Sequence, residues 1–142
     1  MRTLPALVAS LALGTALSAQ RACTSTVLGP GCGPVLTVTF TPVGQAGNHD
    51  MTLAATGLAP DSWGVMAWGV QNFSLPLGGC LLHTDMIWGH VFHTDATATF
   101  GYSRTWPASV DGWYHIQIGT LQVDALGDLT VQGTNAVRAA CQ

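Results

Sequence analysis

The segment from residue 83 to residue 95 holds the densest group of side chains that could do chemistry. It contains His83, Asp85, His93 and Asp95, and imidazole and carboxylate groups are ligands that zinc and other divalent metals accept. If residues 88–90 form the loop of a β-hairpin, His83 lies opposite Asp95 and Asp85 opposite His93, all on one face. The sequence therefore offers a candidate metal site. The simpler interpretation is that these side chains face solvent on the wet side of a sheet.

The five tryptophans form a second group of interest, because they are many for so short a chain. An aromatic ring offers a sugar a flat apolar surface with a polar edge. Trp88, Trp106 and Trp113 lie beside glycine, proline or a predicted turn, and they are the candidates for an exposed ligand-binding platform. Trp63 and Trp68 are an odd number of positions apart, so in one straight strand they would face opposite ways. At least one of these two is expected in the core.

Sequence features that would support catalysis are missing. There is no G-x-S-x-G nucleophile motif, and there is no glutamate, so a glycosidase carboxylate pair would have to consist of aspartates alone. The glycines punctuate turns, and none forms a phosphate loop that leads from a strand into a helix. We expect a protein that is not an enzyme and uses no cofactor.

Charged residues are few and mostly acidic. Residues 20–142 contain three arginines, seven aspartates and no lysine, a formal excess of four negative charges. Phosphate binding requires clustered basic residues, so nucleic acid is not an expected partner. The absence of lysine and glutamate also removes two of the best helix formers, whereas residues typical of strands are plentiful.

The four cysteines, Cys23, Cys32, Cys80 and Cys141, predict two disulfides rather than a zinc site, because no C-x₂-C pair is present. Four cysteines allow three pairings, and sequence alone does not choose among them. Because domain termini often lie close together, the pairing Cys23–Cys141 with Cys32–Cys80 is favoured.

The first 19 residues have the order of a secretory signal peptide. A short basic start is followed by an apolar run over residues 4–17 and then by small residues. The run is shorter than the roughly 20 residues of a membrane-spanning helix. We therefore expect a signal helix at 1–19, cleaved after Ser18 or Ala19, and a single secreted domain at 20–142. The expected location is secreted or cell envelope, with no membrane span after cleavage.

The elements that must position these side chains are strands. Apolar and polar residues alternate with the period of a half-buried strand, and Gly, Pro, Asn and Asp interrupt the runs. The runs lie at 36–41, 51–55, 65–70, 80–86, 98–103, 113–123 and 129–137. About eight strands with no helical pattern between them predict an antiparallel β-sandwich, jelly-roll or immunoglobulin-like.

Several short motifs carry a resemblance to a known group. They are GPGCGP at 29–34, LGGCLL at 77–82, TDA at 94–96, Pro107, QVD at 122–124 and TNAV at 134–137. In these the chain resembles uncharacterised secreted β-sandwich domains of planctomycete-type bacteria. The resemblance implies no catalytic motif and supports a Cys32–Cys80 disulfide. It also implies a turn at 94–97 after one long strand over 80–93, which would separate the four candidate metal ligands.

Together these observations predict a non-catalytic secreted structural or adhesive β module. One alternative is a carbohydrate-binding module that uses Trp88, Trp106 or Trp113. A second alternative is a secreted protein that binds a divalent metal through His83, Asp85, His93 and Asp95. The expected partners are a cell-surface glycan or further copies of the same chain.

Overall fold

The computed structural model describes residues 21–44, 47–123 and 125–142, which form eleven β-strands and no helix. The predicted signal peptide at 1–19 lies outside the described residues, and no helix within them could cross a membrane. The strands in chain order are β1 (Cys23–Gly29), β2 (Val35–Val43), β3 (Asn48–Thr56), β4 (Trp63–Gly69), β5 (Leu75–Leu77), β6 (Cys80–Leu82), β7 (Trp88–His93), β8 (Thr99–Trp106), β9 (Gly112–Val123), β10 (Leu129–Gly133) and β11 (Ala136–Cys141).

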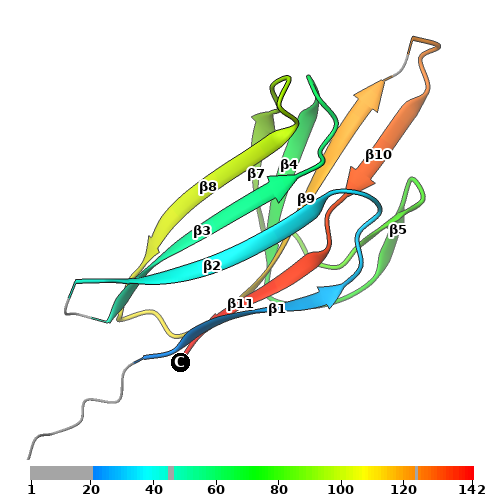
Figure 1. Ribbon diagram of the computed structural model, residues 1–142. Coiled ribbons are helices and arrows are strands. Elements are labelled where there is room, and N and C mark those ends of the chain that lie inside the picture. The colour runs from blue at the N-terminus through cyan, green and yellow to red at the C-terminus, as the bar shows by residue number, and fades with distance from the viewer. Residues whose placement is uncertain (1–20, 45–46, 124) are drawn as a thin grey trace, which may run out of the picture.

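Nine of the strands form two antiparallel sheets that pack face to face, and β5 and β6 form a separate two-stranded sheet. The larger sheet has the order β1-β11-β9-β4-β7, with β10 also pairing with β9, and the smaller sheet has the order β2-β3-β8. Figure 1 shows the smaller sheet in front of the larger one and the β9–β10 hairpin extending beyond the rest of the molecule. The expected all-β antiparallel sandwich with two disulfides is confirmed.

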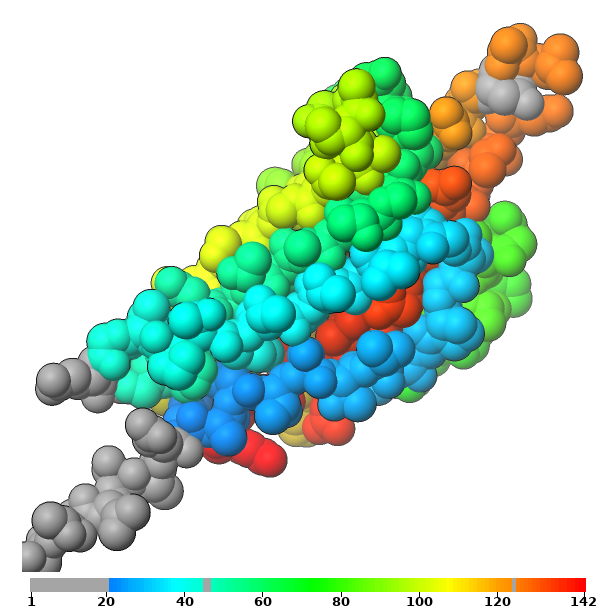
Figure 2. Space-filling view, viewed as in Figure 1, coloured from blue at the N-terminus to red at the C-terminus, as the bar shows by residue number. Residues whose placement is uncertain are grey.

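The two sheets meet along β1 and β2. Figure 2 shows the side chains of the smaller sheet covering the front face, with part of β11 visible between β1 and β2. The Ser25 hydroxyl on β1 donates a hydrogen bond to the Val38 carbonyl on β2 at 2.8 Å. This bond joins one sheet to the other at that edge.

Alternation in the sequence explains the core-facing pattern of the smaller sheet. In β2, Leu36 and Val38 are buried, whereas Thr37 and Thr39 are exposed. Val38 lies opposite Leu53 of β3, which is also buried. A strand with one buried face requires this two-residue period, because neighbouring side chains point to opposite faces.

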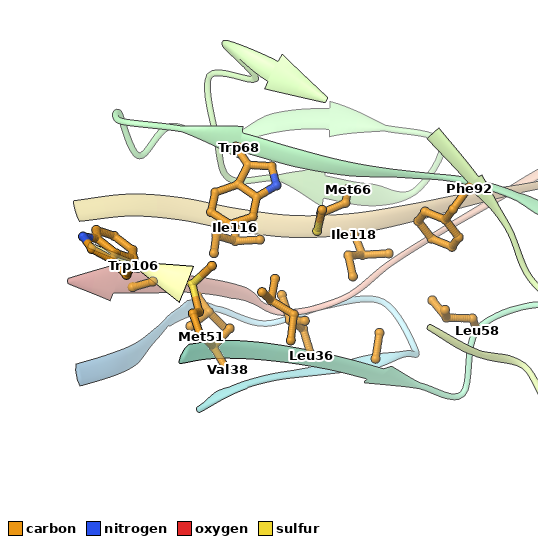
Figure 3. Packing of buried hydrophobic residues seen from close by; sticks show 14 of the residues in the cluster. Leu36, Val38, Met51, Leu58, Met66, Trp68, Phe92, Trp106, Ile116 and Ile118 are labelled. Carbon is orange, nitrogen blue, oxygen red and sulfur yellow. The ribbon is translucent and has the colours of Figure 1, made fainter. Parts of the chain in front are cut away.

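The core fills the space between the sheets. Figure 3 shows Met66, Trp68, Ile116 and Ile118 of the larger sheet pointing toward residues of the smaller sheet, with Trp106 at one end of the core. At the other end Phe92 stacks on Phe100 with ring centroids 3.9 Å apart. The Phe92 ring lies directly over Gly64 of β4, where an added Cβ would come within 2.3 Å of it. A glycine is therefore needed at that position.

Both disulfides of the favoured pairing are present. Cys23 and Cys141 are register partners on β1 and β11, with Cα atoms 4.1 Å apart. Cys32 and Cys80, with Cα atoms 5.5 Å apart, join the β1–β2 loop to β6. The first bond ties together the ends of the described domain, and the second fixes a segment outside the larger sheet.

The predicted strand over 129–137 is divided into β10 and β11 at Thr134 and Asn135. The buried Thr134 hydroxyl accepts a hydrogen bond from the Ile118 amide at 3.0 Å. The Asn135 side chain accepts a hydrogen bond from the Leu36 amide at 2.8 Å and donates one to the Leu36 carbonyl at 3.0 Å. The break therefore lets the Asn135 side chain form hydrogen bonds with the backbone of the edge strand β2, which belongs to the opposite sheet.

The predicted strand over 80–86 is shorter than expected and ends at Leu82. The backbone amide of His83 donates to the Gln117 side chain at 2.7 Å, and Gln117 lies on the outer face of β9. Residues 70–87 thus connect β4 to β7 across the outside of the larger sheet. We call these residues the covering segment.

Candidate ligand-binding cleft

A cleft of about 420 Å³ opens at the end of the sandwich where β4 and β8 end and β7 begins. Four of its lining side chains are aromatic, and one is an arginine. Its lining residues are Met51, Trp68, Ile87, Trp88, Arg104, Thr105, Trp106, Pro107, Val110 and Tyr114. A cleft of this size with mostly apolar walls and few polar groups is typical of small-ligand sites.

The aromatic rings form a connected series along the cleft. Trp88 of β7 lies opposite Trp68 of β4 in the register, and their ring centroids are 5.8 Å apart. Trp68 contacts Tyr114 of β9 at 5.8 Å, and Tyr114 contacts Trp106 of β8 at 5.4 Å. Edge-to-face and tilted contacts of this kind each add about 0.5–1.5 kcal/mol beyond burial. The series therefore forms a rigid wall.

Only part of this wall is open to solvent. Trp88 is 46% exposed, whereas Trp68 and Trp106 are 6% and 5% exposed. The Trp106 indole N–H donates to the Val110 carbonyl at 2.7 Å, which fixes that ring. Trp88 thus supplies the accessible aromatic surface, and the buried rings hold it in place.

The cleft exists because the contacts between β7 and β8 stop before these strands end. From the closed end, Phe92 packs on Phe100, and His90 packs on Tyr102 with centroids 6.0 Å apart. The same two-residue progression brings Trp88 to the level of Arg104, and both residues line the cleft. Arg104 therefore follows Phe100 and Tyr102 along the same face of β8, and it carries a long charged side chain in place of a packed ring.

Arg104 occupies a core-facing position. It lies opposite the buried Met51 in the β3–β8 register, so its side chain starts on the inner face of the sheet. Arg104 is nevertheless solvent-exposed, because the cleft is open at this level. Within the part of the chain that the structure describes, its guanidinium has no ion pair or hydrogen-bond partner.

The three tryptophans predicted to form a platform are not all exposed on one surface. The prediction that Trp106 is exposed in a loop before Pro107 is wrong. Trp106 is the last residue of β8 and belongs to the core. Trp113 is 48% exposed, but it lies on the outer face of β9, where the Arg138 guanidinium stands 5.0 Å from its ring centroid. Trp88 and Trp106 line the cleft together, and Trp113 lies elsewhere.

The prediction for the other two tryptophans is confirmed. Trp68 is buried in the core, and Trp63 is 62% exposed on the outer face of β4. The Trp63 ring contacts His93 of β7 edge-on at 5.0 Å.

The prediction of a hairpin that brings the four metal ligands together is wrong. Residues 88–90 are not a loop but the start of β7, which pairs with β4 from Trp68↔Trp88 to Trp63↔His93. His83 is buried in the covering segment, whereas His93 packs against Trp63 at the outer edge of the sheet. Among residues 21–44, 47–123 and 125–142, no group of three or more His, Cys, Asp or Glu is placed to hold a metal ion.

The two aspartates of that set have local structural roles. Asp85 accepts hydrogen bonds from the backbone amides of Val70 at 2.7 Å and Gln71 at 3.0 Å. The bonds from the Gln71 and Val70 amides lower the pKa of Asp85. Asp95 accepts from the hydroxyl and the amide of Thr97, and these bonds lower the pKa of Asp95. Both carboxylates therefore organise turns.

A turn follows β7 at 95–98, one residue later than the turn at 94–97 that the family resemblance implies, and the single long strand is not present. The Ala98 amide donates to the Asp95 carbonyl at 3.1 Å, which closes a turn after β7. Residues 80–93, however, contain two strands separated by residues 83–87. The interruption follows from the hydrogen bonds of His83 and Asp85 to other parts of the fold.

Among the cleft residues that sequence reasoning missed are two aromatic wall residues, Trp68 and Tyr114, and the arginine Arg104. The signal for Arg104 was the two-residue period of β8, because Phe100, Tyr102, Arg104 and Trp106 alternate with small or hydroxylated residues. The predicted strand over 98–103 ended too early to include it.

Comparison of the chain with protein-family models, with curated proteins and with solved structures found no match. The resemblance to secreted domains of planctomycete-type bacteria stays a prediction.

Proposed function

We propose that this chain is a non-catalytic adhesive β module that binds a glycan in the aromatic cleft. The observation that carries the proposal is the half-exposed Trp88 ring, which contacts the buried Trp68 ring at the mouth of a cleft of about 420 Å³. A rigid ring loses little conformational entropy on binding, and its flat face suits the apolar face of a sugar.

The proposal places this binding outside the cell. Two disulfides join all four cysteines, and such bonds are typical of proteins that fold in an oxidising environment. Export through the predicted signal at 1–19, to the cell envelope or beyond, is part of the proposal. Self-association and a purely structural role without a ligand are the competing interpretations.

Trp88→Ala tests the proposed site, with Trp113→Ala as the matched control. The two rings are almost equally exposed, at 46% and 48%, but they lie on different faces of the larger sheet. Affinity electrophoresis in native gels, each containing one soluble polysaccharide, measures binding across a panel of neutral and acidic polymers. We expect Trp88→Ala to weaken retardation by at least one polysaccharide on the order of tenfold and Trp113→Ala to leave it unchanged.

Two results would contradict the proposed function. One is that no polysaccharide retards the wild-type protein. The other is that both variants lose retardation equally, which would move the contact away from the cleft. A thermal unfolding curve for each variant shows whether a loss reflects the site or the fold.

A further inference from the structure

Arg104 is the unusual residue of the cleft. Its register partner Met51 is buried, and its neighbours on the same face of β8, Tyr102 and Trp106, both make ring contacts inside the sandwich. Positions of this kind normally carry apolar side chains, because a charge that faces the core must be solvated or paired. Packing in the core therefore does not explain an arginine at position 104.

The other arginines of the described chain already have partners. Arg21 forms an ion pair with Asp111 at 3.0 Å, and Arg138 stands over the Trp113 ring. Arg104 has neither kind of contact within the described residues. It is thus the described arginine with neither an ion pair nor a ring contact, and the five N–H donors of its guanidinium remain available to a ligand.

The surroundings of Arg104 leave its charge uncompensated. None of the described residues that line the cleft is acidic. Asp50, which precedes Met51 on β3, is directed to the other face of the sheet, where it accepts a hydrogen bond from Thr105 at 2.7 Å. A chain with an excess of negative charge therefore presents a local positive site inside an aromatic cleft.

A guanidinium presents its donors in a planar fork that matches a carboxylate or a sulfate, and it binds such anions with charge-assisted hydrogen bonds. Trp88 at the same level supplies the flat apolar surface. Together they match a sugar ring that carries an acidic group.

We propose that the cleft selects anionic sugars, uronates or sulfated sugars, and that Arg104 pairs with their acidic group. The inference rests on the proposed function, because it specifies the ligand class of the same cleft. Arg104 is the specificity-determining residue in this scheme, and Trp88 supplies affinity for the ring itself.

The test compares wild-type protein, Arg104→Gln and Arg138→Gln in gels that contain polygalacturonate, a sulfated galactan or a neutral glucan. Glutamine keeps hydrogen-bonding capacity at position 104 but removes the charge. We expect the wild type to be retarded by at least one acidic polymer and on the order of tenfold less by the glucan. Arg104→Gln should lose this preference, whereas Arg138→Gln, which removes the same charge from the outer face, should keep it.

The outcomes separate the inference from the function on which it rests. Retardation by polygalacturonate alone identifies the carboxylate as the recognised group, and retardation by the galactan alone identifies the sulfate. If binding depends on Trp88 but Arg104→Gln binds as wild type, the glycan function stands and the anionic preference is overturned. If Arg138→Gln loses as much as Arg104→Gln, the attraction is a general effect of charge, and the inference is also overturned. If no polymer binds, both proposals fail.

Discussion

Asp85 shows how one side chain organises the fold without being part of the cleft. Its carboxylate closes the end of β4 by accepting two backbone N–H groups, and it reaches them because Gly69 has no side chain. An added Cβ at Gly69 would come within 1.9 Å of the carboxylate oxygen. The histidines and aspartates between 83 and 95 thus serve the fold separately, although the sequence brings them together.

The lowered pKa of Asp85 makes a prediction about acid stability. The carboxylate form is favoured in the folded state by the Gln71 and Val70 amides, so its pKa lies below the ordinary value for an aspartate. The stabilisation is therefore fully present above the pKa that Asp85 has in the unfolded chain. It is lost as the pH falls through the lower pKa that Asp85 has in the folded protein. Asp85→Asn should show a smaller loss of stability than the wild type between about pH 5 and pH 2.

Urea denaturation at a series of pH values measures this difference. The same direction is expected for Asp95→Asn, because the bonds from Thr97 lower the pKa of Asp95. Curves for wild type and Asp85→Asn that run parallel over the whole acid range would contradict the assigned role of the carboxylate.

At the scale of elements, one buried glutamine holds part of the covering segment against the larger sheet. The Gln117 side chain on β9 accepts from the His83 amide at 2.7 Å and donates to the carbonyls of Leu81 at 2.9 Å and Thr134 at 2.8 Å. It therefore ties β6 and the β10–β11 break to the outer face of the larger sheet. The Cys32–Cys80 disulfide fixes the same segment covalently.

Gln117→Leu nearly keeps the volume of this side chain and removes its hydrogen bonds. Three backbone groups would then lose their partners. Two of these bonds, to the His83 amide and the Thr134 carbonyl, are buried, and each buried unsatisfied group costs about 1–3 kcal/mol. We expect a fall of about 2–4 kcal/mol in the free energy of unfolding, measured by chemical denaturation with the disulfides intact. Gln71→Leu in the exposed part of the same segment should change it by less than about 0.5 kcal/mol. Equal effects of the two substitutions would contradict the role given to Gln117.

Elements with a clear period could be predicted from the sequence, and elements with glycine or proline at a critical place could not. β2 and β3 follow from alternation alone, with the buried Leu36, Val38 and Leu53. β7 lies inside the long strand over 80–93 that the resemblance implies, but the hairpin alternative missed its start because Trp88, Gly89 and His90 resemble a turn, whereas Gly89 lies within the strand opposite Ala67. Trp106 was assigned to a loop because Pro107 follows it, although β8 extends to Trp106.

The cleft itself could not be predicted, because it depends on contacts between strands that are distant in the sequence. Trp68, Trp88, Trp106 and Tyr114 come from four different strands. Which of them meet depends on sheet order and register, and no local pattern encodes either.

At the scale of the whole molecule, the sandwich is closed by packed rings at the Phe92 end and opens into the aromatic cleft at the Trp88 end. Two disulfides hold the ends of the described domain and its covering segment, so the cleft is built on a cross-linked frame. Such a frame suits an adhesive module, because a preorganised site binds with a smaller entropic cost.

The most direct test of the cleft as a glycan site is an NMR titration that follows the indole N–H signals. Oligogalacturonate, a sulfated galacto-oligosaccharide and a neutral gluco-oligosaccharide are added in turn to the isotope-labelled protein. We expect a dose-dependent shift of the Trp88 signal with at least one of them, while the exposed Trp63 and Trp113 signals stay in place. Shifts confined to Trp63 or Trp113, or no shift of any indole signal at millimolar oligosaccharide, would contradict it.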